Sequence, residues 1–352
     1  MDTRATGRGV GDHPCVPGLR LRAIGRQSLR ALALGMLPLV LLLAGCASVI
    51  GGSGGVVRQP ALVTGPSLPP RTLSPLPPLL SVPASPAAAV ILTNPITGGV
   101  YIARDADVEL PMASTTKIMT ALVAVTSGQP DQSITVGSDI QSLAGTGASL
   151  AGLVPGERLT LRELLYGLLL PSGDDAAIAI ADGVAGSQAN FVALMNQQAQ
   201  RMGLVHTHYV NVHGLDATGQ YSSAADLASL AAAALRDPVI AAVVATPAIT
   251  LPATAGHPTL PLTNTNELLD APAGAGVTIL GVKTGATGNA GYCLVFAASG
   301  PHGDLIGVLL HDTTDNSEQR FADAHTLLAW GVALEARIHL LRRPGGLQSG
   351  GL

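Results

Sequence analysis

One hydroxyl and one amine stand three positions apart in the stretch Ser114-Thr115-Thr116-Lys117 of this 352-residue chain. If a helix begins at Ser114, the two side chains lie on one face. A lysine without its extra proton can accept the proton of a nearby serine and turn that serine into a nucleophile. The motif therefore predicts lysine-activated serine chemistry, although Ser-x-x-Lys alone is a common sequence.

Lysine occurs at only two positions, Lys117 and Lys283, and the other 17 basic residues are arginine. Lysine can lose its proton when its surroundings shift its pKa, whereas arginine stays charged. A general preference for arginine does not explain the two exceptions. This usage indicates that each lysine has a specific task.

Two further motifs add groups suited to a binding cleft. Residues 172–174 (SGD) lie at a break between two helical patterns, where a loop can project side chains, although this stretch alone also fits a helix N-cap with acidic residues in the first turn. Lys283-Thr284-Gly285 ends an apolar strand pattern. Its ammonium and hydroxyl suit a carboxylate, and its glycine lets another chain approach the backbone.

The order Ser-x-x-Lys, Ser-x-Asx, Lys-Thr-Gly, with separations of 58 and 111 residues, resembles the penicillin-binding proteins and serine β-lactamases. Residues 190–231, with NVHGLD and YSSAADLA, look like the middle of the low-molecular-weight D-alanyl-D-alanine carboxypeptidases. Residues 281–298 (GVKTGATGNAGYCLVFAA) resemble their third motif and following strand. The likeness covers roughly residues 88–335 and implies a β-lactamase/DD-peptidase-like α/β fold.

The resemblance implies a role for each motif residue. Ser114 would attack the carbonyl of the penultimate D-Ala in a peptidoglycan stem peptide, with Lys117 as general base. Such a base needs a lowered pKa. The backbone N–H groups of Ser114 and Ala286 would form the oxyanion hole, and Ser172 would relay a proton to the departing amine.

The remaining motif residues, Asp174, Lys283, Thr284 and Gly285, would bind substrate, with the lysine and threonine holding the terminal carboxylate. The resemblance also implies that β-lactams are covalent inhibitors and that no cofactor or metal is needed. His206, His208 and His213 cluster without a cysteine or acidic partner at a ligand spacing.

One residue departs from the family pattern, because Asp174 stands where asparagine is usual. An asparagine amide donates and accepts hydrogen bonds, whereas an ionised aspartate only accepts. A carboxylate beside Lys117 also favours the charged form of that lysine, against its role as base. The departure is either tolerated or causes slower turnover or an altered substrate preference.

Three other functions remain open on the same motifs. A DD-endopeptidase uses the same machinery. A class A β-lactamase needs a Glu-x-x-Leu-Asn element between the second and third motifs, and neither NTNELLD nor NVHGLD fits it. A non-catalytic penicillin- or peptidoglycan-binding domain is the third alternative, supported only by Asp174.

The N-terminal region predicts export. Residues 1–45 combine an arginine-rich start with an apolar run and end in LAGC, which resembles a lipoprotein signal with lipidation at Cys46; an uncleaved signal anchor is the alternative. Residues 46–87 are rich in Pro, Gly and Ser and predict a tether. We therefore expect a lipid-anchored protein at the outer face of the bacterial cytoplasmic membrane.

The elements that must position the motifs follow from hydrophobic patterning. Two apolar runs around TNPITGG predict a hairpin, several helices follow, and three strands and a closing helix end the domain at residues 88–340, before a loose tail at 341–352. We expect the hairpin to join the late strands in one antiparallel sheet flanked by helices, with the middle helices as an inserted subdomain and a cleft between the parts.

The net charge and the cysteine content argue against a nucleic-acid partner and against a structural disulfide. Loss of residues 1–45 removes six Arg and two Asp and changes the formal net charge from −4 to −8. Nucleic-acid binding needs a basic surface, so this partner is not expected. Only Cys293 remains after Cys46, and no structural disulfide is predicted.

Overall fold

The computed structural model describes residues 81–271, 274, 276–312 and 316–342. The chain divides into two units, Met1–Leu73 and Ser74–Leu352, and every described residue belongs to the second. The signal segment at 1–45, Cys46, the tether up to residue 80 and the tail from residue 343 lie outside the described residues. What the sequence predicts for those segments stays a prediction.

A five-stranded antiparallel sheet with the order β2-β1-β9-β8-β7 forms the centre of the described unit. The N-terminal hairpin therefore pairs with the C-terminal strands, and the predicted fold class is confirmed. β1 pairs with β9 from Ala89 opposite Leu310 to Thr93 opposite Ile306. The five strands are β1 (Ala89–Thr93), β2 (Val100–Arg104), β7 (Thr278–Thr287), β8 (Gly291–Gly300) and β9 (Gly303–Leu310).

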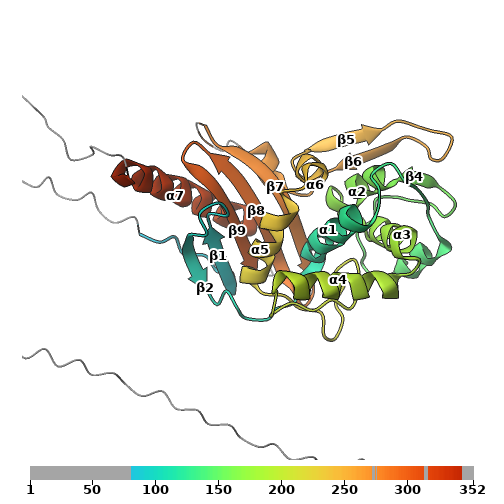
Figure 1. Ribbon diagram of the computed structural model, residues 1–352, viewed down its shortest axis with the longest axis horizontal. Helices are drawn as coiled ribbons and strands as arrows, with labels where there is room; N and C mark the ends of the chain where they lie inside the picture. Colours follow the sequence, from blue (N-terminus) through green and yellow to red (C-terminus); the bar gives the residue numbers. More distant parts are fainter. Residues whose placement is uncertain (1–80, 272–273, 275, 313–315, 343–352) are drawn as a thin grey trace, which may run out of the picture. The chain divides into compact units, whose positions relative to one another are not determined.

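Helices cover both faces of this sheet (Figure 1), with α7 (Gln319–Arg342) on one side and α5 (Ala224–Ala234) on the other. Alternate residues of a strand point to opposite faces. In β1, Ala89 and Ile91 therefore join the core shared with the helical block, whereas Val90 and Leu92 join the core under α7. Burial on both faces explains why the interior strand β8, between β9 and β7, is apolar along most of its length.

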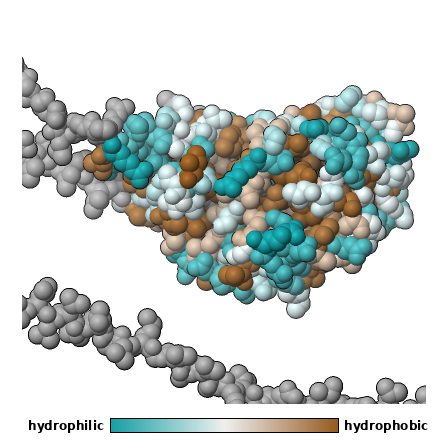
Figure 2. All heavy atoms as spheres, in the orientation of Figure 1, coloured by the Kyte–Doolittle hydropathy of each residue, from teal (hydrophilic) through white to brown (hydrophobic). Residues whose placement is uncertain are grey.

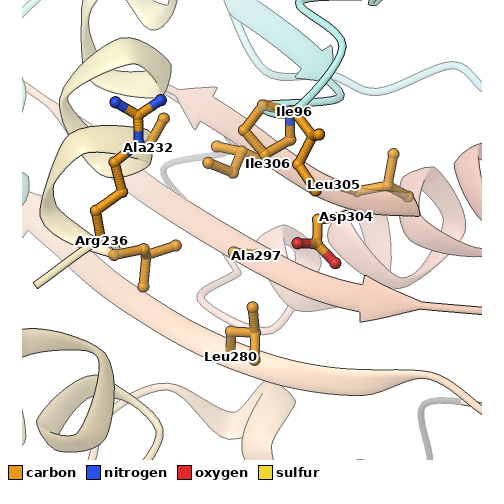
Figure 3. Close-up of a pocket in the computed structure, with 10 residues that line it drawn as sticks. Ile96, Ala232, Arg236, Leu280, Ala297, Asp304, Leu305 and Ile306 are labelled. Carbon is orange, nitrogen blue, oxygen red and sulfur yellow. The ribbon is translucent and has the colours of Figure 1, made fainter. Parts of the chain in front are cut away.

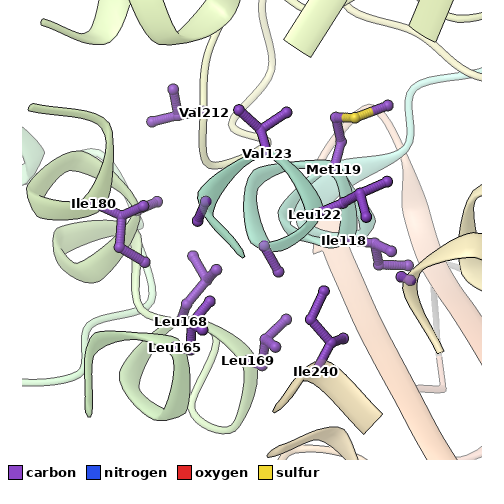
Figure 4. Close-up of a cluster of buried hydrophobic side chains, with 14 of the residues drawn as sticks. Ile118, Met119, Leu122, Val123, Leu165, Leu168, Leu169, Ile180, Val212 and Ile240 are labelled. Atoms are coloured by element: carbon purple, nitrogen blue, oxygen red, sulfur yellow. The ribbon is translucent and has the colours of Figure 1, made fainter. Parts of the chain in front are cut away.

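The middle of the chain folds into a helical block beside the sheet. Its helices are α1 (Lys117–Ser127), α2 (Leu161–Leu169), α3 (Asp174–Ala185), α4 (Gln188–Met202) and α6 (Pro238–Val244). Figure 4 shows α1 at its centre, with Ile118, Leu122 and Val123 surrounded by side chains of α2, α3 and α6. This core holds the helix that follows the first motif in a fixed position.

Local signals in the sequence explain where these helices begin and end. The Thr160 side chain and Glu163 form a capping box at the start of α2, and the Ser187 hydroxyl caps α4. Gly203 ends α4 in the left-handed conformation that glycine adopts without steric cost.

Several short elements were not predicted from the sequence. They are the hairpin of β3 (Ser133–Thr135) with β4 (Arg158–Thr160), the hairpin of β5 (Ala248–Leu251) with β6 (Leu260–Thr263), α6, and the 3₁₀ helices η1 (Ala113–Thr116), η2 (Ser138–Leu143) and η3 (Glu267–Asp270). Strands of three or four residues are too short to show a clear period.

On the face shown in Figure 2, hydrophobic and hydrophilic residues alternate over the sheet and the helical block. Within the described ranges, no single helix is long and apolar enough to cross a membrane. Two pairs of consecutive helices, α3 with α4 and α5 with α6, reach that length and apolar character only when the two helices of a pair are taken together, and both pairs are bent.

Candidate active site

The first motif lies in a 3₁₀ turn rather than at the start of an α-helix. Ser114 belongs to η1, and α1 begins at Lys117. Side chains three positions apart eclipse in a 3₁₀ helix. Ser114 and Lys117 are therefore close together, as expected, but through the geometry of a 3₁₀ turn and not of an α-helix. The Nζ atom of Lys117 donates a 2.8 Å hydrogen bond to Ser114 Oγ.

The turn that presents Ser114 is held in an unusual backbone conformation. Ala113 has a φ of 48°, a left-handed value that is uncommon for residues other than glycine. Gly214, at φ 102°, packs so closely that a Cβ there would overlap the Ala113 carbonyl and lie 2.9 Å from Ser114 N. Strained conformations persist when the surrounding structure determines them, and here the surrounding loop provides that support.

Lys117 is fully buried and has three oxygen neighbours. Besides Ser114 Oγ, its Nζ contacts the His213 carbonyl oxygen at 2.7 Å and Asp174 Oδ1 at 2.5 Å. The short separation between Lys117 Nζ and Asp174 Oδ1 establishes an ion pair. Burial lowers the pKa of Lys117, and the carboxylates of Asp174 and Asp175 act in the opposite direction.

The second motif does not cap a helix through its serine. α3 has Gly173 as its N-cap, and Ser172 has a φ of 66°. Its Oγ is buried and has no hydrogen-bond partner within the described residues. Buried polar atoms are normally paired, so this hydroxyl is available for a reacting group or a bound molecule.

A loop is tied to the second motif through Asp175. Its carboxylate accepts hydrogen bonds from the backbone N–H groups of Ala151, Gly152 and Leu153 at 2.8–3.0 Å. Asp174 N also donates to the Ser149 carbonyl at 2.8 Å. Asp175 thus fixes the loop against the start of α3 and is structural.

The third motif packs directly against the first. A Cβ on Gly285 would lie 3.1 Å from Met112 O and 3.2 Å from Ser114 N, so a larger residue would displace the nucleophile. Lys283 and Thr284 are buried, and the Lys283 Nζ donates to the Thr284 carbonyl at 3.1 Å. The structure therefore brings all three motifs together around Ser114 and Lys117.

Burial lowers the pKa of Lys283 well below its usual value, and the positive charges of Lys117 and Arg320 lower it further. An anion bound here would offset that unfavourable charge.

Ala286, which follows Gly285 on β7, lines a concavity of about 270 Å³ with Thr287 and Tyr292. That the backbone N–H group of Ala286 is part of the oxyanion hole stays a prediction.

Sequence reasoning missed two residues at this site. Arg320 on α7 is buried, donates from Nη1 to the Gly285 carbonyl at 3.2 Å, and lies over the Tyr292 ring. Thr265 contacts Thr284 with its Oγ1 at 2.6 Å and donates from its N–H to Leu170 O. In the sequence, Arg320 lies in an ordinary amphipathic helix pattern and Thr265 in a polar loop, so no motif marked either residue as part of the site.

A larger cavity of about 380 Å³ lies away from the motifs, between the end of α5, the β1–β2 turn and the sheet (Figure 3). It is lined by Ile96, Arg236, Leu280, Asp304 and other residues, none of which belongs to a motif. Within the described ranges, no three His, Cys, Asp or Glu residues are grouped to hold a metal ion.

The D-alanyl-D-alanine carboxypeptidase model of peptidase family S11 matches residues 79–314. D-alanyl-D-alanine carboxypeptidase DacC of Escherichia coli is 37% identical over 260 residues, which cover 72% of this chain and 62% of DacC. DacA of the same bacterium is 36% identical over 270 residues, covering 74% and 64%. The chain thus spans less than two thirds of the length of these relatives.

Solved structures show the same similarity. The Streptomyces K15 DD-transpeptidase superposes with a TM-score of 0.67 at 33% identity, covering 72% of this chain and 100% of that one. A D-alanyl-D-alanine carboxypeptidase from Mycobacterium tuberculosis superposes with a TM-score of 0.64 at 33% identity, covering 72% and 93%.

Proposed function

This chain belongs to the D-alanyl-D-alanine carboxypeptidase family, and from that premise we propose that it removes the terminal D-Ala of peptidoglycan stem peptides through an acyl-enzyme on Ser114. The observation that carries the proposal is the 2.8 Å contact between Lys117 Nζ and Ser114 Oγ, with Gly285 packed against the same serine. Peptidoglycan peptides ending in D-Ala-D-Ala are the substrate, and β-lactams are covalent inhibitors.

Acylation follows from the positions of these groups. Ser114 Oγ bonds to the carbonyl carbon of the penultimate D-Ala while its proton passes to Lys117. The backbone N–H groups of Ser114 and Ala286 bind the oxygen that becomes negative, and one such donor contributes about 3–4 kcal/mol in a serine protease. The C–N bond then breaks, and Ser172 relays the proton from Lys117 to the departing amine.

The buried cations select the substrate end. Lys283 and Thr284 bind the terminal carboxylate, whose negative charge compensates the buried ammonium. Arg320 adds positive charge behind Gly285, and the Thr265 hydroxyl extends the polar surface beside Thr284. Water then hydrolyses the acyl-enzyme and regenerates Ser114.

The test is chromatography of products from a purified stem pentapeptide. We expect release of one D-Ala per peptide, and no release from Ser114→Ala, whose fold is checked by circular dichroism. Intact-mass measurement after incubation with benzylpenicillin gives a stable adduct on Ser114. Rapid hydrolysis of the penicillin contradicts the proposal in favour of a β-lactamase, and absence of both adduct and D-Ala release indicates a binding domain.

A second acyl acceptor is suggested by the solved relative named a DD-transpeptidase. An amine in place of water would give transpeptidation, and a cross-linked peptide as donor would give DD-endopeptidase activity. Adding glycylglycine to the pentapeptide assay and supplying a cross-linked dimer separates these reactions, since each yields a product of different mass.

For the location of the protein, we infer a lipid anchor at Cys46, with the enzyme at the outer face of the bacterial cytoplasmic membrane. The support is the sequence of residues 20–46, with its arginine-rich start, apolar run and LAGC ending. Metabolic labelling with a palmitate analogue tests it: the full chain takes up label and Cys46→Ala does not.

A further inference from the structure

The Lys117 amine has two neighbours that can only accept hydrogen bonds, and a third, the Ser114 hydroxyl, that can donate or accept. A lysine ammonium has three donors and no acceptor, and Ser114 Oγ, the His213 carbonyl and Asp174 Oδ1 lie within 2.8 Å of Nζ. In the ion pair with the Asp174 carboxylate, Lys117 is protonated and donates to Ser114. Before Lys117 can accept the serine proton, it must lose one of its own.

Only one of the three neighbours can keep that proton. Ser114 is itself the group to be deprotonated, and the His213 carbonyl is not a base. Solvent does not reach Lys117, whose side chain is 0% exposed, and Asp174 is 3% exposed. The Asp174 carboxylate, 2.5 Å away, is therefore the proton acceptor within reach.

The other charged groups around the pair do not compete for this role. The Asp175 oxygens are occupied by backbone N–H groups. Burial lowers the pKa of the His213 ring to about 4, and its Nδ1 accepts from Leu215 N. Lys283 on β7 donates to the Thr284 carbonyl and Arg320 on α7 to the Gly285 carbonyl, and among the described residues neither is hydrogen-bonded to Lys117 or Asp174.

We propose that Asp174 stores the proton that Lys117 must lose, so that the ion pair becomes a neutral amine beside a carboxylic acid before acylation. This inference rests on the proposed function. One proton moves from nitrogen to oxygen, and the net charge of the pair is unchanged. The neutral Lys117 then takes the Ser114 proton and later returns it to the departing amine, while Asp174 keeps the stored proton until the cycle ends.

Two physical effects support the shift. A bound substrate covers the partly exposed Ser114 beside the pair, and a drier environment disfavours charged forms. A protonated carboxyl also has one O–H donor and one carbonyl acceptor, as the usual asparagine amide has a donor and an acceptor. Asp174 can therefore serve in its neutral form where the family generally has asparagine.

The two possible routes for the proton differ in the number of protons on the reactive form. With storage on Asp174, the reactive pair carries one proton, so acylation falls at low pH only when the pair gains a second. With loss to solvent, the reactive pair carries none, so acylation falls below the pKa of Lys117, which Asp174 raises. Asp174→Asn distinguishes the two by the direction of the change.

The measurement is the rate of Ser114 acylation by benzylpenicillin against pH, followed by intact mass, for the wild-type chain and Asp174→Asn. We expect the acylation rate of Asp174→Asn to begin its decline on the acid side at a higher pH than the rate of the wild type. Below that pH the variant loses a factor of ten in rate per pH unit, while the wild-type rate is still constant. A decline displaced to lower pH, or no acylation by a folded Asp174→Asn at any pH, overturns the proposal.

The control is Asp182→Asn, which removes a carboxylate from the same helix α3 outside the site and leaves the pH profile unchanged. Circular dichroism checks each fold, and Asp174→Ser replaces the asparagine variant if that variant does not fold. Absence of any Ser114 adduct in the wild type refutes the proposed function itself. Adducts with the wrong direction of pH change refute only the role of Asp174.

Discussion

Replacing Gly214 by alanine tests whether the loop around it holds the nucleophile in place. At φ 102° the residue has a left-handed conformation, and an added Cβ overlaps the Ala113 carbonyl and lies 2.9 Å from Ser114 N. The obstructing atoms are backbone, so they cannot rotate away. The change must move either this loop or the turn that carries Ser114.

The matched control is Gly219→Ala, because Gly219 also has a positive φ, 85°, but its nearest neighbour would be 3.7 Å from the new Cβ. Both variants lose about 1–2 kcal/mol for placing alanine in a left-handed conformation. Only Gly214→Ala adds overpacking, which costs about 1–3 kcal/mol. We therefore expect it to be less stable than the control by that amount.

The expected effect on chemistry, about 2.7 kcal/mol for a 100-fold change in rate, is similar in size to the effect on stability. A displacement of about 1 Å in a reacting group lowers rates about 100-fold, so Gly214→Ala should acylate with benzylpenicillin about 100-fold more slowly than Gly219→Ala. Thermal unfolding measures the stability difference, at about 2–4 °C per kcal/mol, and intact mass against time measures acylation. Equal acylation rates in the two folded variants would refute the idea that Gly214 positions the nucleophile.

Three other substitutions test the site. Lys283→Ala should raise the KM for a D-Ala-D-Ala peptide at least about tenfold, equivalent to about 1.4 kcal/mol, and an unchanged KM would exclude a carboxylate contact. Thr265→Val removes the hydroxyl 2.6 Å from Thr284 Oγ1 and should weaken peptide binding by about 0.5–1.5 kcal/mol, seen as a KM change at constant fold. Asp175→Ala leaves three loop N–H groups without their acceptor, two of them on the buried residues Ala151 and Leu153. It should lower the free energy of unfolding by about 2 kcal/mol or more, measured by urea denaturation, and a loss below about 1 kcal/mol would contradict the loop-fixing role.

The boundaries of the long elements were predictable because hydrophobic periodicity and caps are local. The break between α2 and α3, the end of α4 at Gly203 and the three late strands all appear in the structure close to their predicted positions. The sheet order followed from pairing the N-terminal hairpin with those strands. The short hairpins and η1 escaped prediction, since three or four residues carry little periodic signal.

The sequence by itself identified the reactive groups. They are the two lysines, the serine three positions before Lys117, and the aspartate at position 174, where asparagine is usual. Side-chain chemistry and short-range spacing depend on covalent order, so they need no fold to be read. Tertiary structure decided the rest, because contacts between Gly285 and Ser114, Arg320 and Gly285, or Thr265 and Thr284 join residues far apart in the chain. It also buried Lys117 with Asp174 at 2.5 Å, and the loss of water around that pair, which no linear spacing encodes, determines where its proton lies.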